Sequence, residues 1–312
     1  MSTAFLYPGQ GAQVPGMLHQ LPDHAVVSET LRAATQILNR DVLELDTEAA
    51  LASTVAVQMA LFICGVAVTR ALRAKGIKPD LVVGLSVGAF AAAVGAGAVS
   101  FTDGLTLVKM RAELMEKAYP QGYGLAAIVG LSEARLAEIV SETNGPDSPV
   151  FIANRNSLTQ IVIAGSDAAM QAVLDRVENE GARTAKRLPV SVPSHCPLMR
   201  SVADELTRQM ARIEIQKPEA VYVSNRRARA SRDPEGIRED LATNITHPVQ
   251  WHDATTVAYE RGVRLFIELP PGDALTELAS AAFPEARCVA VGDTRIDSVI
   301  NLAKREIAPM GQ

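Results

Sequence analysis

One serine of this sequence lies between two glycines, directly after an apolar run. The stretch Gly84-Leu85-Ser86-Val87-Gly88 fits the pattern G-x-S-x-G, in which the glycines permit the crowded turn that presents a serine hydroxyl as a nucleophile. The residues before it predict a strand and those after it a helix, which is the order such a turn requires. A glycine-rich strand end whose serine only caps a helix would have the same letters, so both interpretations stand.

A serine becomes a good nucleophile only when a base takes its proton, and histidine is the usual base near neutral pH. Of the five histidines, His195 stands out because Pro193 and Pro197 hold it in a stiff turn between a predicted strand and a predicted helix. A rigidly held side chain is what a catalytic base needs. Solvated, packing or backbone-shaping roles are the simpler interpretation for the other four: His19, His24, His247 and His252.

Arg111 is unusual because apolar residues surround it on a predicted helix. Leu107, Val108, Leu114 and Met115 share its face, whereas the neighbouring charges fall on another. A buried guanidinium needs an anionic partner, because an unpaired buried charge costs several kcal/mol. That partner is either a carboxylate of the protein or a bound ligand.

The loop at residues 8–13, with the sequence PGQGAQ, follows a predicted strand at residues 3–7. At the carboxyl edge of an α/β sheet such a loop lines the crevice where ligands bind. Its backbone amides could face an oxyanion, although a simple turn would also account for it.

The order of predicted elements indicates an α/β fold with a parallel sheet and an inserted small subdomain. Predicted strands cover residues 3–7, 81–83, 220–223, 264–269 and 287–292, and predicted helices cover residues 49–75, residues from 89 onward, and the segment after Pro197. Residues 123–190 predict the order β-α-β-β-α-β of a ferredoxin-like unit. We therefore expect a core of residues 1–122 and 191–312, a subdomain of residues 123–190, and a loose tail after Ala308.

Composition excludes several classes of protein. The chain has 312 residues, 48% hydrophobic and 21% charged, with a net charge of −5, and it has no basic stripe of the kind that binds nucleic acid. Its three cysteines favour reduced thiols in the cytoplasm, and no spacing typical of a metal site occurs. Residues 49–69 and 81–102 carry no charge, but their polar residues and glycines favour buried elements over membrane spans. No secretory signal is evident.

Six motifs together resemble the malonyl-CoA:acyl-carrier-protein transacylase family, in the family's order and over almost the whole chain. They are YPGQGAQ at 7–13, the Ser86 turn, RAELM at 111–115, SVPSHC at 191–196, PVQW at 248–251 and ELPPG at 268–272. The resemblance implies an α/β-hydrolase-like core with a ferredoxin-like subdomain. It also implies ping-pong transfer of a malonyl group from malonyl-CoA to the thiol of an acyl carrier protein, with no bound cofactor or metal.

The resemblance also assigns roles to residues. Ser86 would attack the thioester while His195 takes its proton, and the amides of Gln10 and Val87 would hold the oxyanion. Arg111 would bind the malonyl carboxylate as a two-pronged ion pair. Asn244 falls where the family usually has a glutamine near the catalytic histidine, so it would orient His195, if only through its backbone carbonyl. Three further polar residues match positions near the family's cleft, with a structural role equally open: Gln58, Asn154 and Asn156.

Two positions depart from the family pattern. The family usually has histidine and glutamate where this chain has Leu85 and Ala89. The variant is similar to the malonyltransferase (epsilon) subunit of bacterial malonate decarboxylase, which loads a carrier bearing a phosphoribosyl-dephospho-CoA arm. We therefore expect that role ahead of fatty-acid synthesis. A serine thioesterase or hydrolase on the same fold, and a noncatalytic binding subunit with a vestigial serine, remain as alternatives.

Overall fold

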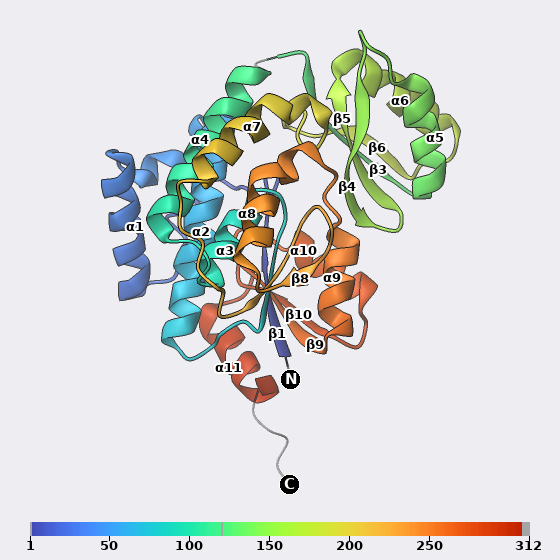
Figure 1. Cartoon of the computed structure of the whole chain (residues 1–312). Helices are drawn as coiled ribbons and strands as arrows, with labels where there is room; N and C mark the ends of the chain where they lie inside the picture. Colours follow the sequence, from blue (N-terminus) through green and yellow to red (C-terminus); the bar gives the residue numbers. More distant parts are fainter. Residues whose placement is uncertain (1, 120, 308–312) are drawn as a thin grey trace.

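A six-stranded sheet forms the centre of the larger of two units in the computed structural model, which describes residues 2–119 and 121–307 (Figure 1). In spatial order its strands are β10 (Arg287–Ala290), β9 (Val263–Glu268), β1 (Ser2–Tyr7), β2 (Leu81–Gly84), β7 (Val221–Val223) and β8 (Ala230–Ser231). The first five run parallel, and β8 pairs antiparallel with β7 at the edge. The predicted parallel α/β sheet is thus confirmed.

The strands are apolar on both faces because helices cover the sheet on both sides. Phe5 and Tyr7 of β1 belong to the core on one face, whereas Ala4 and Leu6 belong to the core on the other. The alternation follows from the two-residue period of a strand.

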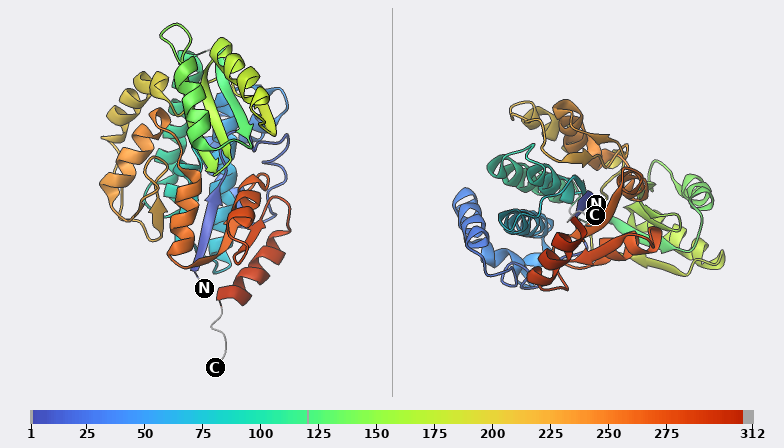
Figure 2. Two further views of the ribbon diagram at one scale, coloured as in Figure 1. Left: turned by 90° about the vertical axis from the view of Figure 1, so that its right-hand side faces the viewer. Right: turned by 90° about the horizontal axis from the view of Figure 1, so that it is seen from below.

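Within the described residues, eight α-helices of the larger unit lie around this sheet, and a ninth joins it to the smaller unit (Figures 1 and 2). On the face of Phe5 lie α2 (Thr54–Ala74), α3 (Gly88–Gly95), α4 (Phe101–Ala118), α8 (Pro234–Thr243) and α11 (Ile296–Ile307), with α1 (Ala25–Leu38) against α2 and α4. On the opposite face lie α9 (Trp251–Glu260) and α10 (Ala274–Ala282), and α7 (Arg200–Met210) packs between the two units.

Helix α2 is the buried centre of its layer. By length and composition it could cross a membrane, but 89% of its most apolar 18-residue stretch is buried inside the protein, as expected for a core helix. The sequence predicted its start near residue 49, whereas it begins at Thr54. Ser53 caps it by accepting a hydrogen bond from the Val55 amide at 3.1 Å, and the Glu116 carboxylate accepts one from the Thr54 amide at 3.0 Å.

The smaller unit is a four-stranded antiparallel sheet with two helices on one face. Its elements are β3 (Tyr123–Val129), α5 (Glu133–Thr143), β4 (Val150–Ser157), β5 (Gln160–Ser166), α6 (Asp167–Asn179) and β6 (Thr184–Arg187). The spatial order of the strands is β4-β5-β3-β6. The predicted order of elements is confirmed, with Ser132 as the predicted N-cap of α5. The expected loose tail lies outside the described residues.

Two kinds of contact join the units. Apolar residues of β3 and β5 pack with α4 and α7 in a shared core that includes Leu125, Val162 and Leu206. Val249, from the segment before α9, pairs with β4 through its backbone: its amide donates to Ala153 O at 2.8 Å, and its carbonyl accepts from Arg155 N at 2.9 Å. The face of the smaller sheet opposite α5 and α6 is therefore fixed over the carboxyl ends of the parallel strands.

Candidate active site

Ser86 lies in the sharp turn between β2 and α3, with a positive φ of 57°. The two glycines of its motif are required by close packing. A Cβ at Gly84 would lie 2.3 Å from the backbone carbonyl of Gly88, and a Cβ at Gly88 would lie 2.2 Å from Tyr7 O. The turn therefore fits only if both positions lack a side chain, which explains the spacing seen in the sequence.

His195 contacts Ser86 directly. Its Nε2 lies 2.6 Å from Ser86 Oγ, and its Nδ1 lies 3.0 Å from the backbone carbonyl of Asn244. Because a carbonyl only accepts, Nδ1 carries the proton and Nε2 is free to accept the serine hydroxyl. The His195 backbone, with φ of 65°, is held by its amide donating to Ile245 O at 2.7 Å. The expected rigid presentation of this imidazole is seen in the structure.

Asn244 contacts the imidazole through its main chain. It lies in the short 3-10 helix Asn244–Thr246, is fully buried, and its side-chain amide has no hydrogen-bond partner among the described residues. Its carbonyl alone therefore meets His195, as the sequence had left open.

The electrostatic setting keeps His195 neutral. Burial, reinforced by the nearby Arg111 charge, lowers its pKa from 6.5 to about 3. At neutral pH the imidazole is therefore unprotonated and able to take the proton of Ser86.

Arg111 is 1% exposed, as its apolar helix face predicted. Its Nη2 donates to Ser86 Oγ at 3.1 Å and its Nη1 to Gln58 Oε1 at 2.5 Å, while its Nε has no hydrogen-bond partner among the described residues. No carboxylate of the described chain forms an ion pair with it. Burial lowers its pKa to about 9. Of the two partners that the sequence left open, a protein carboxylate is not found.

Gln10 and Val87 line the same cavity, and their backbone amides have no hydrogen-bond partner among the described residues. The cavity measures about 30 Å³, and Ser86 and His195 line it as well. The loop of Gln10 packs directly on the turn, since a Cβ at Gly9 would lie 2.6 Å from the Leu85 side chain. Two free amides beside a nucleophile are the usual components of an oxyanion hole.

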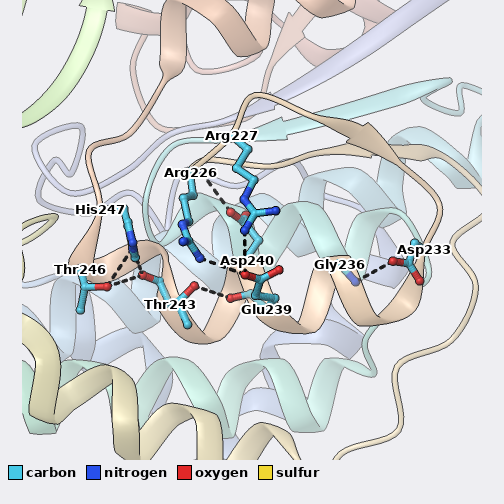
Figure 3. A network of polar contacts seen from close by, with 9 residues as sticks. All are labelled: Arg226, Arg227, Asp233, Gly236, Glu239, Asp240, Thr243, Thr246 and His247. Atoms are coloured by element: carbon cyan, nitrogen blue, oxygen red, sulfur yellow. Dashed lines mark hydrogen bonds and ion pairs between the residues drawn. The ribbon is translucent and has the colours of Figure 1, made fainter.

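The remaining sequence candidates are spread over the molecule. Asn154 lines the cavity, whereas Ala89 is buried in the core of the larger unit. His24 caps α1, His19 pairs with Asp46, and His247 bonds to Thr243 and Thr246 beside α8 (Figure 3). Among the described residues no group of histidines, cysteines and acidic side chains could hold a metal ion, and all three cysteines are free.

Sequence reasoning missed one residue at the site and gave another too little weight. The side chain of Asn225 accepts a hydrogen bond from the Ser86 amide at 2.8 Å, yet 139 residues separate the two and no motif joins them. Gln58, noted only as a polar residue near the cleft, holds the Arg111 guanidinium. A buried glutamine on an otherwise apolar helix was its only signal.

A serine-histidine pair with two free amides at the end of a parallel strand defines a site for acyl transfer. The chain matches the acyl transferase domain family over residues 4–307. It is 36% identical over 281 residues to the malonyl CoA-acyl carrier protein transacylase of Escherichia coli K12, covering 88% of this chain and 91% of the relative. It is 32% identical over 297 residues to that of Haemophilus influenzae, covering 93% and 95%.

Solved structures agree with these relatives. The malonyl CoA-acyl carrier protein transacylase of Coxiella burnetii superimposes with a TM-score of 0.93 at 34% identity, covering 99% of this chain and 98% of that one. A malonyl-transacylase in complex with its type II polyketide acyl carrier protein gives a TM-score of 0.91 at 33% identity, covering 98% and 100%.

The chain therefore belongs to the malonyl-CoA:acyl-carrier-protein transacylase family. It is an enzyme of the S-malonyltransferase class, and such enzymes work without a metal or bound cofactor. The relatives named here are malonyl transacylases, so they give no support to the expectation that the malonate decarboxylase subunit is the nearest relative.

Proposed function

We propose that this protein moves a malonyl group from malonyl-CoA to the thiol of an acyl carrier protein of the fatty-acid-synthesis type, through a malonyl ester of Ser86. The single observation that carries the proposal is the buried Arg111, which has no carboxylate partner among the described residues and whose Nη2 lies 3.1 Å from Ser86 Oγ. A malonyl thioester supplies that missing carboxylate at its free end, separated by one methylene group from the thioester carbonyl that the serine attacks.

In the first half-reaction Ser86 Oγ attacks the thioester carbonyl while its proton moves to His195 Nε2. The amides of Gln10 and Val87 stabilise the oxyanion, Arg111 binds the malonyl carboxylate, and Asn244 O holds the imidazole in the required tautomer. When the carbon-sulfur bond breaks, His195 returns the proton to the departing CoA thiolate. The products are malonyl-Ser86 and free CoA.

In the second half-reaction the carrier's prosthetic thiol gives its proton to His195 and attacks the Ser86 ester. The carbon-oxygen bond breaks, the serine regains its proton from the imidazole, and the malonyl group leaves on the carrier. A water molecule in place of the thiol would make the protein a hydrolase, which is the alternative that the same residues allow.

We further propose that residues 1–122 and 191–312 form an α/β-hydrolase-like core and residues 123–190 a ferredoxin-like subdomain. The nucleophile turn at the end of a parallel strand supports the first assignment. The βαββαβ order, with each neighbouring pair of strands antiparallel, supports the second. We place the enzyme in the cytoplasm, with malonyl-CoA and the carrier as its partners.

Intact-mass measurement after mixing with malonyl-CoA tests the chemistry. The wild type should gain one malonyl group, and Ser86→Ala should gain none. Adding a carrier thiol should discharge the adduct onto the carrier. An adduct that forms equally on Ser86→Ala would overturn the nucleophile assignment, and discharge at the same rate without any thiol would identify a hydrolase.

An acceptor comparison tests the pathway. Holo-carrier from fatty-acid synthesis and the malonate decarboxylase carrier are offered side by side to the malonyl-enzyme. Faster transfer to the fatty-acid carrier is expected, because the identity to transacylases extends over most of the chain. Leu85 and Ala89, which differ from the usual family residues, favour the decarboxylase carrier as the second candidate, and faster transfer to it would reverse the proposal.

A further inference from the structure

The nucleophile turn is held by a side chain from another strand. Asn225 follows β7, is 2% exposed, and makes two hydrogen bonds to the backbone on either side of Leu85. Its Nδ2 donates to Gly84 O at 2.7 Å, and its Oδ1 accepts from Ser86 N at 2.8 Å. Both bonds go to the peptide groups that set the direction of the serine.

These two bonds continue the pairing between β2 and β7 beyond the last paired residues, Val83 and Val223. In a parallel sheet one residue donates its N–H to the residue before its neighbour and accepts from the residue after it. The Asn225 carboxamide does the same around Leu85. It therefore supplies hydrogen-bond partners for the backbone groups at the end of β2, where the chain leaves the sheet. This allows Ser86 to adopt its left-handed conformation.

The main chain of Asn225 is itself held by two hydrogen bonds. The backbone N–H of Asn225 donates to Asp240 Oδ2 at 3.0 Å, and its backbone carbonyl accepts from Gln250 N at 2.8 Å. Asp240, on α8 and 4% exposed, also accepts from the Tyr222 hydroxyl at 2.7 Å. It accepts from the Arg226 amide at 3.1 Å as well (Figure 3). The position of the carboxamide is thus fixed by residues outside the catalytic cavity.

We propose that Asn225 is a positioning residue for the reaction: its carboxamide sets the direction of the Ser86 hydroxyl and of the following Val87 amide. The inference rests on the proposed role of Ser86 as nucleophile. Since every acyl donor reacts with the serine of the same turn, loss of the Asn225 hydrogen bonds should slow acylation by malonyl-CoA and by acetyl-CoA by the same factor. Arg111→Ala should not behave in this way, because its guanidinium, although it also contacts Ser86 Oγ, would bind the carboxylate that malonyl-CoA has and acetyl-CoA lacks.

The test compares Asn225→Asp and Asn225→Ala with the wild type. A carboxylate keeps the shape and can accept from Ser86 N, but it cannot donate to Gly84 O. We expect kcat for acylation to fall about 10- to 100-fold, because small displacements of a reacting atom carry losses of that size, with KM for malonyl-CoA within about 3-fold. Inactivation by phenylmethylsulfonyl fluoride, a serine reagent without a carboxylate, should slow by a similar factor.

Asn144 offers the matched control. Its side chain also accepts a backbone hydrogen bond, from Val150 N at 3.0 Å, but it lies in the smaller unit at the end of α5. Asn144→Asp and Asn144→Ala should leave acylation within about 3-fold of the wild type.

Three results would overturn the inference. They are acylation by folded Asn225 variants at the wild-type rate, a loss confined to one acyl donor, and unfolding of both variants at the assay temperature, which would mean that Asn225 holds the fold as a whole. If the wild type itself forms no malonyl adduct, it is the proposed function that fails. If it forms one and the Asn225 variants do so equally fast, only the inference fails.

Discussion

At the scale of single residues, the Ser86 hydroxyl lies between a base and a cation. It donates to His195 Nε2 and accepts from Arg111 Nη2. The Arg111 charge helps to lower the His195 pKa, so a bound malonyl carboxylate, by neutralising that charge, should raise it again. Substrate binding would then strengthen the base at the moment when the proton must move.

Replacing Arg111 should separate malonyl from acetyl transfer. A charge-assisted pair contributes about 1.5–3 kcal/mol, so Arg111→Ala should slow malonyl-enzyme formation by roughly 10- to 150-fold, with much less effect on acetyl-CoA. Because the guanidinium has no carboxylate partner within residues 2–119 and 121–307, the free energy of unfolding should not fall. Equal losses for both donors, together with a clear loss of stability in urea denaturation, would show that Arg111 is structural.

The pH dependence of acylation should report the buried imidazole. The His195 pKa lies well below 6.5 in the free enzyme, and the reaction needs the neutral form. As pH falls through 6.5, kcat/KM for malonyl-CoA should therefore persist and should decline only at lower pH. Arg111→Ala should move this decline to higher pH, because it removes a charge that disfavours the protonated form. A wild-type profile with an acid limb at about 6.5 would contradict the burial of His195.

At the scale of elements, the site depends on how closely β1, β2 and α3 approach one another. The start of α3 lies against the end of β1 at Gly88, and Gly84 lies against Gly88 within the turn itself. Val87, at the start of this helix, lines the cavity that Gln10 also lines. The two glycines thus permit the turn and also allow β1, β2 and α3 to pack closely against one another.

A methyl group at Gly88 should disturb this contact. Its Cβ would lie 2.2 Å from Tyr7 O, a backbone atom that cannot move alone, so Gly88→Ala should lower the free energy of unfolding by about 1–3 kcal/mol and slow acylation strongly. Gly145→Ala is the control, since nothing lies within 4 Å of its added Cβ; it should stay within about 0.5 kcal/mol in urea denaturation. Equal behaviour of the two variants would refute the packing argument.

At the scale of the whole molecule, the smaller sheet closes the catalytic cavity. Leu125 of β3 both lines the cavity and belongs to the core shared by the two units. Val249 joins β4 to the segment that follows the Asn244 carbonyl. The geometry around His195 and the position of the smaller unit are therefore coupled.

Matched valine truncations should reveal this coupling. Val162 lies in the core between the units, and Val173 lies on α6, in the core on the other face of the smaller sheet. Val162→Ala and Val173→Ala should each cost about 2 kcal/mol in the free energy of unfolding. Only Val162→Ala should also slow acylation, by about 3- to 10-fold, measured at a temperature where both proteins are folded. Equal acylation rates would mean that the joining core does not position the site.

Much of the fold and site followed from sequence because the signals are local. The Ser86 motif, the prolines around His195, the apolar face of Arg111 and the order of elements at residues 123–190 each depend on neighbours within a few positions. Helices α1, α8, α9, α10 and α11 were not predicted. The start of α2 was misplaced because its cap includes Glu116, 62 residues away.

By itself, the sequence determined the parallel α/β layering and the chemical nature of the serine, histidine and arginine, since periodicity and residue type are properties of short stretches. Only the tertiary structure decided that Arg111 has no carboxylate partner in the described part of the chain, that the Asn244 carbonyl meets His195, and that Asn225 completes the sheet beside Ser86. Those contacts join residues up to 141 positions apart, and only the folded chain brings their atoms within hydrogen-bonding distance.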